Sequence, residues 1–434
     1  MKGTAVLRRQ ILTRSAEVVV IGQGYVGLSL ACAAAEAGFP VTGLDVDERR
    51  VQELRNGATV AGVPERIAGS AVATGRLSFT TDPSVVADAG LVFVCVPTPL
   101  HEGVPDLTHI DAASASAGEH LRPGTLVVLE STTYPGTTEE RVGPALERRG
   151  LRAGKDFLLA YSPERIDPGN TEYAFREVPR VVGGMTPEAT GLATLFYEQL
   201  VEKVMAVSSC RAAELAKLLE NTFRHVNIAL VNEMAMVCHE VGIDVWEVIE
   251  AAATKPFGFM RFSPGPGVGG HCIPLDPAYL AWQVRRDAGH QFRILEEAED
   301  INAQMPAWVA SRIGELLNEH GKSVKGSKVL VLGASYKPDV GDVRESPSIR
   351  IMQALHKRGA KVTFHDPYIE EVVLNGATAR RVELSKVAVE RADLVAVLTP
   401  HRAYDLAWVG DHATLVFDAR NAFGPDAREH VVRL

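Results

Sequence analysis

Short apolar runs that end in polar or glycine-rich turns recur along the first part of the chain. Residues 17–21, 41–44, 91–96 and 126–129 are mostly β-branched or aliphatic. Continuous apolar runs of this length are typical of strands buried on both faces of a parallel sheet. The segment after the first run, LSLACAAAEAG, has a helical composition and ends at Gly38. Strands that alternate with helices in this way predict an α/β domain.

The same pattern returns in the last part of the chain. Strand-like runs occupy residues 328–332, 361–365, 394–398 and 414–418, with helical stretches among them. This arrangement predicts a second, smaller Rossmann-like domain. Its first turn lacks the glycine pattern GxGxxG, so we expect no second dinucleotide there.

A long helix is predicted between the two α/β regions. Residues 211–241 contain no Gly or Pro and keep a helical periodicity. At 1.5 Å per residue this helix would extend about 45 Å, enough to leave one domain, reach another and supply a dimer surface. Lys217, Asn221 and Arg224 fall on one of its faces. The alternative for these three residues is a solvated polar stripe, which is common on helices.

The first turn carries a dinucleotide-binding pattern. Gly22, Gly24 and Gly27 form GxGxxG directly after the first predicted strand, and Asp45 follows the second strand. The glycines allow a tight turn, close approach of a pyrophosphate and close packing of helix on strand. Asp45 would accept hydrogen bonds from an adenosine ribose and would repel a 2′-phosphate, which favours NAD over NADP. The alternative is a tight turn without a ligand.

The amino-acid composition limits which class of protein this chain can belong to and which partners it can bind. The 434 residues are 46% hydrophobic and 23% charged, which is ordinary for a globular chain of two or three domains. No apolar run approaches the length of a membrane span. The net charge of −9 without a basic stripe argues against a nucleic-acid partner. Five cysteines without a CxxC pair indicate a reduced, cytoplasmic chain and no metal site.

A loop rich in Gly and Pro, residues 257–271, leads to Cys272 and then to Asp276. A thiol there could trap an aldehyde as a thiohemiacetal, which loses a second hydride to become a thioester that water cleaves. Lys217 could favour the thiolate, and Lys217 and Asn221 could stabilise negative charge on oxygen. Asp276 could orient or deprotonate water. The alternative for Cys272 is a small buried apolar residue, as we expect for the cysteines within predicted helices and strands.

Several motifs together resemble the nucleotide-sugar 6-dehydrogenase family, which includes the UDP-glucose, UDP-N-acetylglucosamine and UDP-N-acetylmannosamine dehydrogenases. The resemblance covers residues 17–420, and its motifs occur in the order typical of the family. They are Gly22-Gln23-Gly24-Tyr25-Val26-Gly27-Leu28, Glu130-Ser131-Thr132, Ser162-Pro163-Glu164-Arg165, Ala213-Glu214-Leu215-Ala216-Lys217-Leu218, Gly269-Gly270-His271-Cys272, Lys337-Pro338-Asp339 and Arg344-Glu345-Ser346.

The resemblance implies an NAD-dependent oxidoreductase that oxidises a sugar C6 hydroxymethyl group to a carboxylate and consumes two NAD. It implies that Cys272 is the nucleophile and that Lys217, with Asn221 beside it, is the cation near the reacting oxygen. Asp276 would be the partner of Lys217 and of the hydrolytic water. Glu164 would be a general base or position water, and Thr132 would hold that water. His271 could serve as the base for Cys272, but a packing or sugar-contact role is the preferred interpretation.

The resemblance also implies binding residues. Gly22, Gly24, Tyr25, Val26, Gly27, Asp45, Thr98, Thr132 and Arg344 would contact NAD, and for Arg344 the nucleotide of the substrate or a surface salt bridge is the alternative. Glu164, Arg165, Lys217, Asn221, Phe259, Gly267 and Lys337 would contact the nucleotide sugar, with Lys337 at the diphosphate. Arg261 lies near a position whose arginine, in the family, reaches the sugar of a neighbouring subunit.

The resemblance implies three regions. Residues 1–210 would form an NAD-binding Rossmann domain, residues 211–320 a helical region for dimerisation and catalysis, and residues 321–434 a Rossmann-like domain for the nucleotide sugar. The expected partners are a UDP- or TDP-hexose and a second copy of the chain, with no nucleic acid or membrane.

The choice of sugar stays open at this point. The sequences Ser-Pro-Glu-Arg and Gly-Gly-His-Cys resemble the N-acetylhexosamine branch of the family, and UDP- or TDP-glucose is the alternative substrate. A two-electron dehydrogenase of the β-hydroxyacid type shares the first domain and the long helix with its lysine. It needs neither the Cys272 loop nor a nucleotide-binding C-terminal domain. A non-catalytic sensor of nucleotide sugars would not need Lys217, Asn221, Cys272 and Asp276 together.

Overall fold

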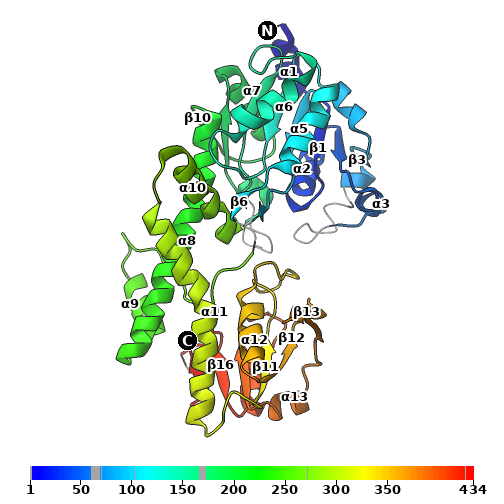
Figure 1. Ribbon diagram of the computed structural model, residues 1–434. Helices are drawn as coiled ribbons and strands as arrows, with labels where there is room; N and C mark the ends of the chain where they lie inside the picture. The colour runs from blue at the N-terminus through cyan, green and yellow to red at the C-terminus, as the bar shows by residue number, and fades with distance from the viewer. Residues whose placement is uncertain are drawn as a thin grey trace. The chain divides into compact units, whose positions relative to one another are not determined.

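The computed structural model of this chain describes residues 2–59, 69, 71–101, 103–165, 173–270, 272–425 and 427–434; for Lys2 and Cys272 it describes the backbone only. The chain forms two compact units. The first contains Met1–Glu220 and Ala278–Asp287, and the second contains Asn221–Pro277 and Ala288–Leu434. Each unit has a parallel sheet flanked by helices (Figure 1). The predicted α/β class, with two Rossmann-like domains and a long central helix, is therefore confirmed.

The sheet of the first unit has eight strands among the described residues, in the order β10-β9-β8-β7-β4-β1-β2-β3. The strands from β8 to β3 run parallel to their neighbours, whereas β9 is antiparallel to β8 and parallel to β10. The strand bounds are β1 Val18–Ile21, β2 Val41–Leu44, β3 Leu77–Thr80, β4 Leu91–Val94, β7 Leu126–Leu129, β8 Leu158–Tyr161, β9 Arg180–Gly184 and β10 Val204–Val207. A separate short pair joins β5 Leu100–His101 to β6 Val104–Pro105.

Alternate residues of the central strands enter two different cores. In β1, Val18 and Val20 belong to the core on one face of the sheet, and Val19 and Ile21 belong to the core on the other. Both faces are covered, which explains why β1, β4 and β7 read as unbroken apolar runs. The covering helices are α1 Lys2–Leu12, α2 Tyr25–Glu36, α3 Glu48–Arg55, α5 Thr108–His120, α6 Gly143–Leu146 and α7 Pro187–Tyr197; short helical turns cover Pro83–Asp88, Thr138–Val142, Glu147–Arg149 and Phe175–Glu177.

The second unit contains a smaller parallel sheet. Its described strands have the order β12-β11-β15-β16-β17. Helices α11 and α12 pack against each other beside this sheet (Figure 1). The elements are β11 Lys328–Leu332, α12 Pro347–Lys357, β12 Lys361–His365, the antiparallel pair β13 Glu371–Leu374 and β14 Ala377–Arg380, α13 Lys386–Glu390, β15 Leu394–Val397, α14 Leu406–His412, β16 Val416–Asp418 and β17 Val431–Arg433.

Four long helices follow the first sheet along the chain: α8 Cys210–Val241, α9 Val245–Ala253, α10 Cys272–Ala288 and α11 Arg293–Glu319. Helix α8 is continuous over 32 residues, which confirms the helix predicted for residues 211–241. Both α8 and α10 supply residues to both units. The loop between α9 and α10 is the predicted glycine-rich segment, and helix α10 begins directly at Cys272.

The structure also contains elements that the sequence pattern did not predict. Helix α1 packs Leu7 and Ile11 into the core beside β1, and strands β9 and β10 extend the first sheet. No helix among the described residues is both long and apolar enough to cross a bilayer. These residues also contain no cluster of three or more His, Cys, Asp or Glu side chains that could hold a metal ion.

Candidate active site

The turn after β1 is built so that only glycine fits at two positions. Gly22 has a φ of +89°, and a Cβ there would lie 2.7 Å from the carbonyl oxygen of Cys95. A Cβ on Gly27 would lie 1.8 Å from the carbonyl oxygen of Gly22. Gly24, by contrast, precedes α2 without a side-chain cap and has open space where a Cβ would be. A helix start without a side-chain cap suits a pyrophosphate.

Asp45 lies at the end of β2 and retains acceptor capacity. Its Oδ2 accepts from the N–H of Gln23 at 2.7 Å, and its Oδ1 accepts from the N–H of Asp47 at 3.0 Å. The side chain is only half-buried, and each carboxylate oxygen can accept another hydrogen bond. The position therefore fits a ribose hydroxyl. Tyr25 and Val26, the first residues of α2, are half-buried beside the same turn.

Thr98 and Thr132 lie after the carboxyl ends of β4 and β7, where ligands of open α/β sheets bind. Thr98 is buried, and its carbonyl accepts a hydrogen bond from Tyr279 of α10. Thr132 is half-buried. The neighbouring Ser131 donates to the carbonyl oxygen of Val96 at 2.8 Å, so the ends of β4 and β7 are joined.

Glu164, after the end of β8, is part of a buried charged cluster. It is 7% exposed and accepts from Arg180 Nη2 at 3.2 Å. Arg180, 1% exposed, also lies 3.5 Å from Glu130 Oε2, and Glu130 accepts from the hydroxyl of Tyr197. Burial, with Glu164 adding to it, raises the pKa of Glu130 to about 7, although Arg180 and Tyr197 oppose the shift.

Arg180 and Glu130 had no role in the sequence-based prediction. Glu130 directly follows a predicted strand, which marks the ligand edge of the sheet and was the available signal. Arg180 gave no such signal, because its approach to Glu164 depends on the unpredicted strand β9. Arg165, predicted to contact substrate, forms an ion pair with Glu220 at 2.7 Å and donates to the carbonyl of Pro179 at 2.8 Å.

Three of the predicted catalytic residues of α8 and α10 are buried. In the first unit, Lys217 is 7% exposed. In the second unit, Asn221 donates from Nδ2 to Asp276 Oδ2, and these two side chains are 6% and 2% exposed. Cys272 precedes Asp276 by one helical turn of α10. The side chain of Cys272 and the whole of His271 lie outside the described residues.

The glycine-rich loop packs tightly against a second loop of the same unit. The N–H of Gly270 donates to the carbonyl of Arg344 at 3.0 Å. A Cβ on Gly269 would lie 2.8 Å from the carbonyl oxygen of Glu345 and 2.8 Å from Tyr336 Cβ. The glycines thus allow direct backbone contact. The segment that leads to Cys272 is thereby held against residues 336–345, the loop that carries Lys337 and Arg344.

Two other predicted residues of the glycine-rich loop, Phe259 and Arg261, are exposed, whereas Gly267 is buried. Phe259 is 40% exposed. Arg261 donates to Glu250 and, at 2.9 Å, to Ser263. Gly267 has a φ of +127° and lies against Pro306 and Pro347. None of these contacts tests their predicted roles.

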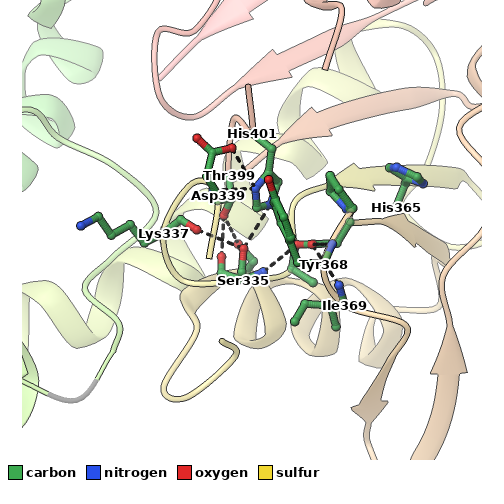
Figure 2. Close-up of polar contacts among 12 residues, drawn as sticks. Ser335, Lys337, Asp339, His365, Tyr368, Ile369, Thr399 and His401 are labelled. Atoms are coloured by element: carbon green, nitrogen blue, oxygen red, sulfur yellow. Dashed lines mark hydrogen bonds and ion pairs between the residues drawn. The ribbon is translucent and has the colours of Figure 1, made fainter. Parts of the chain in front are cut away.

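A network of buried polar groups holds the Lys337 loop (Figure 2). His401 Nδ1 accepts from the N–H of Asp339 at 2.9 Å, so Nε2 carries the hydrogen and donates to Asp366 Oδ2 at 3.0 Å. Ser335 Oγ lies 3.1 Å from the same Nε2 and donates to the carbonyl of Lys337 at 3.2 Å. Figure 2 shows the Lys337 side chain extending away from this network.

This network differs from a hydrolytic triad although it contains Ser, His and Asp. In a triad the Ser and Asp contact different ring nitrogens, whereas Ser335 and Asp366 approach the same nitrogen of His401. All three side chains are buried. Their role is to hold a loop. Arg344, at the far end of that loop, is exposed and paired with Asp342 at 2.7 Å.

Three family models match this chain. They describe the NAD binding domain, residues 16–201, the central domain, residues 211–304, and the UDP binding domain, residues 330–425, of one family. The chain belongs to the UDP-glucose/GDP-mannose dehydrogenase family. It is therefore an NAD-dependent nucleotide-sugar dehydrogenase, which confirms the resemblance, the cofactor and the enzyme class predicted from the sequence.

Relatives within the family cover most of this chain. It is 34% identical to the UDP-N-acetyl-D-mannosamine dehydrogenase of Pyrococcus horikoshii over 88% of this chain and 89% of that protein. It is 38% identical to the UDP-N-acetyl-D-glucosamine 6-dehydrogenase of Pseudomonas aeruginosa over 81% of this chain and 83% of that protein. A solved structure of the Pyrococcus horikoshii enzyme aligns with a TM-score of 0.87 and 31% identity, covering 96% of this chain and 98% of that one.

Proposed function

We propose that this dehydrogenase oxidises the C6 hydroxymethyl group of a UDP-N-acetylhexosamine to a carboxylate in two successive steps. One hydroxymethyl group, two NAD and one water give one carboxylate, two NADH and three protons. The observation that carries the proposal is the direct packing of the loop before Cys272 against the Lys337 loop. This packing links a thiol for covalent catalysis to the UDP-binding domain within one unit.

Cys272 retains the aldehyde in the proposed reaction. Bound NAD supplies the hydride acceptor in each oxidation. The thiol adds to the aldehyde carbon, and the carbonyl oxygen takes up a proton to give a thiohemiacetal. Loss of a hydride and a proton from this adduct gives a thioester. Water then attacks the thioester carbon, the C–S bond breaks, and the acid and the free thiol are released.

The remaining buried residues stabilise charge and position water. The Lys217 ammonium and the Asn221 amide stabilise negative charge on the reacting oxygen. Asp276 fixes the orientation of the Asn221 amide by accepting its hydrogen bond, and it also positions the hydrolytic water. Glu164 accepts the proton of that water, which Thr132 helps to hold.

Assignment of the sugar is supported by the named relatives. Those from Pyrococcus horikoshii and Pseudomonas aeruginosa act on N-acetylated sugars by their names, and the Gly-Gly-His-Cys sequence of this chain resembles the same branch. UDP- or TDP-glucose remains the alternative substrate. Discrimination between them depends on a few contacts, each of which contributes about 1–3 kcal/mol.

The test is NADH release across UDP-N-acetylglucosamine, UDP-N-acetylmannosamine, UDP-N-acetylgalactosamine, UDP-glucose and TDP-glucose. We expect turnover of an N-acetylhexosamine with two NADH per sugar, and no acid product from Cys272→Ala. Cys238→Ala, which alters a buried cysteine of α8 in the same unit, is the control. One NADH per sugar with a stable aldehyde would contradict the four-electron reaction.

A second copy of the chain is proposed to cover one face of α8. Seven large apolar side chains of this helix are exposed: Leu215, Leu219, Phe223, Leu230, Met234, Val237 and Val241. At 3.6 residues per turn they fall within an arc of about 100°, on the opposite side from Lys217 and Asn221. A continuous apolar stripe of this length indicates an interface. Light scattering should therefore give twice the chain mass, and Leu219→Glu should reduce it.

A further inference from the structure

The buried cluster around Arg180 has a composition that packing alone does not explain. It contains two carboxylates, Glu130 and Glu164, and one guanidinium, all less than 10% exposed. Buried charges are costly unless they are paired and hydrogen-bonded. A cluster with unequal numbers of the two charges, next to a predicted catalytic residue, therefore calls for a functional explanation.

The register of the sheet brings Arg180 to Glu164. Strand β9 pairs antiparallel with β8 through Tyr161 with Gly183 and Ala160 with Gly184. Continued beyond Tyr161, this register sets Glu164 opposite Arg180. Arg180 Nη1 also lies 3.3 Å from the carbonyl oxygen of Pro163, the residue before Glu164. The guanidinium therefore contacts both the side chain of Glu164 and the backbone that carries it.

Arg180 is itself held on its other sides. Glu130 Oε2 lies 3.5 Å from Nη1, and the rings of Phe175 and Tyr197 lie 4.9 and 5.6 Å from the guanidinium carbon. Tyr197 also donates its hydroxyl hydrogen to Glu130. With contacts on every side, Arg180 has little freedom to change its orientation, and it can impose that orientation on Glu164.

The neighbouring titratable groups define the charge of the cluster. Burial, followed by Glu130, raises the pKa of both Tyr197 and Cys95 well above their usual ranges, so both stay neutral. Burial would lower the pKa of Arg180, but Glu164 and Glu130 raise it, so Arg180 stays charged. Glu130, with a pKa of about 7, is the carboxyl that takes up a proton most readily.

We propose that Arg180 is a positioning residue for Glu164, and that Glu130 holds the guanidinium from its other side. This inference rests on the proposed function, because it assigns to Glu164 the role of base. The guanidinium fixes the carboxylate at the ligand edge of the sheet. Glu130 contacts the same guanidinium and limits its movement.

The proposal predicts different pH effects for two substitutions. Arg180→Gln removes the cation beside Glu164, so the acidic limb of the kcat–pH profile should move to higher pH. Glu130→Gln should move the same limb little, because Glu130, with a pKa of about 7, is already mostly protonated at acidic pH. We expect Arg180→Gln to lower kcat about 100-fold, within the usual range for loss of acid–base catalysis, with a smaller change in the KM of the sugar. Arg180→Lys should restore part of kcat, because it keeps the charge but loses the planar fork.

Further variants separate positioning from folding. Arg180→Gln alone leaves two buried carboxylates without a cation, so Arg180→Gln/Glu130→Gln removes one charge of each sign. The double variant should regain thermal stability but not kcat. Thr190→Val is the matched control, since it removes a 2.9 Å hydrogen bond to Gly184 at the other end of β9 without changing charge. It should lower thermal stability and leave the pH profile unchanged.

Two results would overturn the inference. The first is an Arg180→Gln variant whose kcat per folded molecule and pH profile match those of the unmodified enzyme. The second is an equal shift of the acidic limb in Arg180→Gln and Glu130→Gln. Either result leaves the proposed function intact if the unmodified enzyme releases two NADH per sugar. Failure of the unmodified enzyme to turn over any nucleotide sugar would instead overturn the proposed function and, with it, this role of Arg180.

Discussion

The two Rossmann-like sheets place an aspartate at the same topological position and use it in different ways. Asp45 and Asp366 each follow the second strand of their sheet, β2 and β12. Asp45 accepts two backbone hydrogen bonds and stays half-exposed. Asp366 is fully buried and accepts from four backbone N–H groups and from His401. The first aspartate is available to a ligand, whereas the second organises its own domain.

The turn that follows the first strand also differs between the two sheets. In the first unit, Gly24 is followed at once by α2, whose first N–H groups lack a side-chain cap. In the second unit the chain forms a long loop after Gly333, and α12 begins only at Pro347. The same sheet topology therefore supports a dinucleotide site in one domain and a loop that holds Lys337 in the other. Topology alone does not identify the ligand.

Replacement of Asp366 should give the largest effect. Asp366→Asn puts an amide N–H₂ against donors that now meet a carboxylate oxygen, so we expect a loss of about 3–5 kcal/mol in the free energy of unfolding. Urea denaturation of the second unit measures it. Asp418→Asn is the control, because Asp418 is equally buried but accepts from two N–H groups. An equal loss in the two variants would contradict the special role of Asp366.

Acid should remove part of the stabilisation that the Asp366 carboxylate gives to the folded state. Burial would raise the pKa of Asp366, but hydrogen bonds from His401, Ser335 and Tyr368 lower it from 3.8 to about 2. A lowered pKa stabilises the folded state above about pH 4, and this stabilisation, about 2 kcal/mol, is lost as the pH falls from 4 to 2. The difference in unfolding free energy between the unmodified protein and Asp366→Asn should therefore shrink over that interval. A constant difference would argue against the proposed titration.

Replacement of Asp45 should affect ligand binding rather than folding. Asp45→Ala removes the predicted ribose acceptor, and loss of a hydrogen bond to a charged group should raise the KM for NAD about 10- to 30-fold. The KM for the nucleotide sugar should change little. Asp47→Ala is the control, because Asp47 caps α3. Its loss should lower the free energy of unfolding by about 1 kcal/mol without raising the KM for NAD. An equal rise in the KM for NAD in Asp45→Ala and Asp47→Ala would contradict a ligand-binding role for Asp45. The contrast between Asp45 and Asp366 would then be lost.

The smallest effect is expected at Arg402. Its backbone N–H donates to Asp339 at 3.0 Å, and its exposed side chain pairs with the same carboxylate. Asp339 has a φ of +61°, so this contact helps to hold an uncommon backbone conformation in the Lys337 loop. Arg402→Gln keeps the hydrogen bond from the backbone N–H to Asp339. It should raise the KM for the nucleotide sugar two- to fivefold and leave the KM for NAD unchanged. Arg428→Gln, which removes another exposed ion pair of the same unit, should change neither KM.

The sequence was sufficient to predict the strands whose pattern of apolar residues matches their burial in the sheet. Strands β1, β4, β7 and β15, and β11 after Lys328, are buried on both faces and consist of unbroken apolar runs. Strand β10 is an apolar run with two exposed residues, so its sequence does not reveal its position in the sheet, and β9 ends in two glycines. Helix α1 was missed because only part of its apolar face is buried against the sheet.

The site was predictable where one element supplies the geometry. Lys217 and Asn221 share a face of α8 because they lie four residues apart in one helix. The hydrogen bond between Asn221 and Asp276 required the packing of α8 and α10. The pairing of Lys217 with Asp276, which the resemblance implies, stays a prediction. The pairing of Arg180 with Glu164 depends on an antiparallel register, which no local pattern contains.

The contact between Gly270 and Arg344 also bears on how the enzyme uses a part of the substrate that does not react. The loop before Cys272 is hydrogen-bonded to the loop of the UDP-binding domain, so a nucleotide that orders this loop should also order the backbone that leads to the thiol. Binding energy from the remote end of a substrate can then be used at the reacting carbon. A free hexose lacks the nucleotide that binds this domain. We therefore expect its oxidation to be slow, because the catalytic centre is not assembled and because binding is weak.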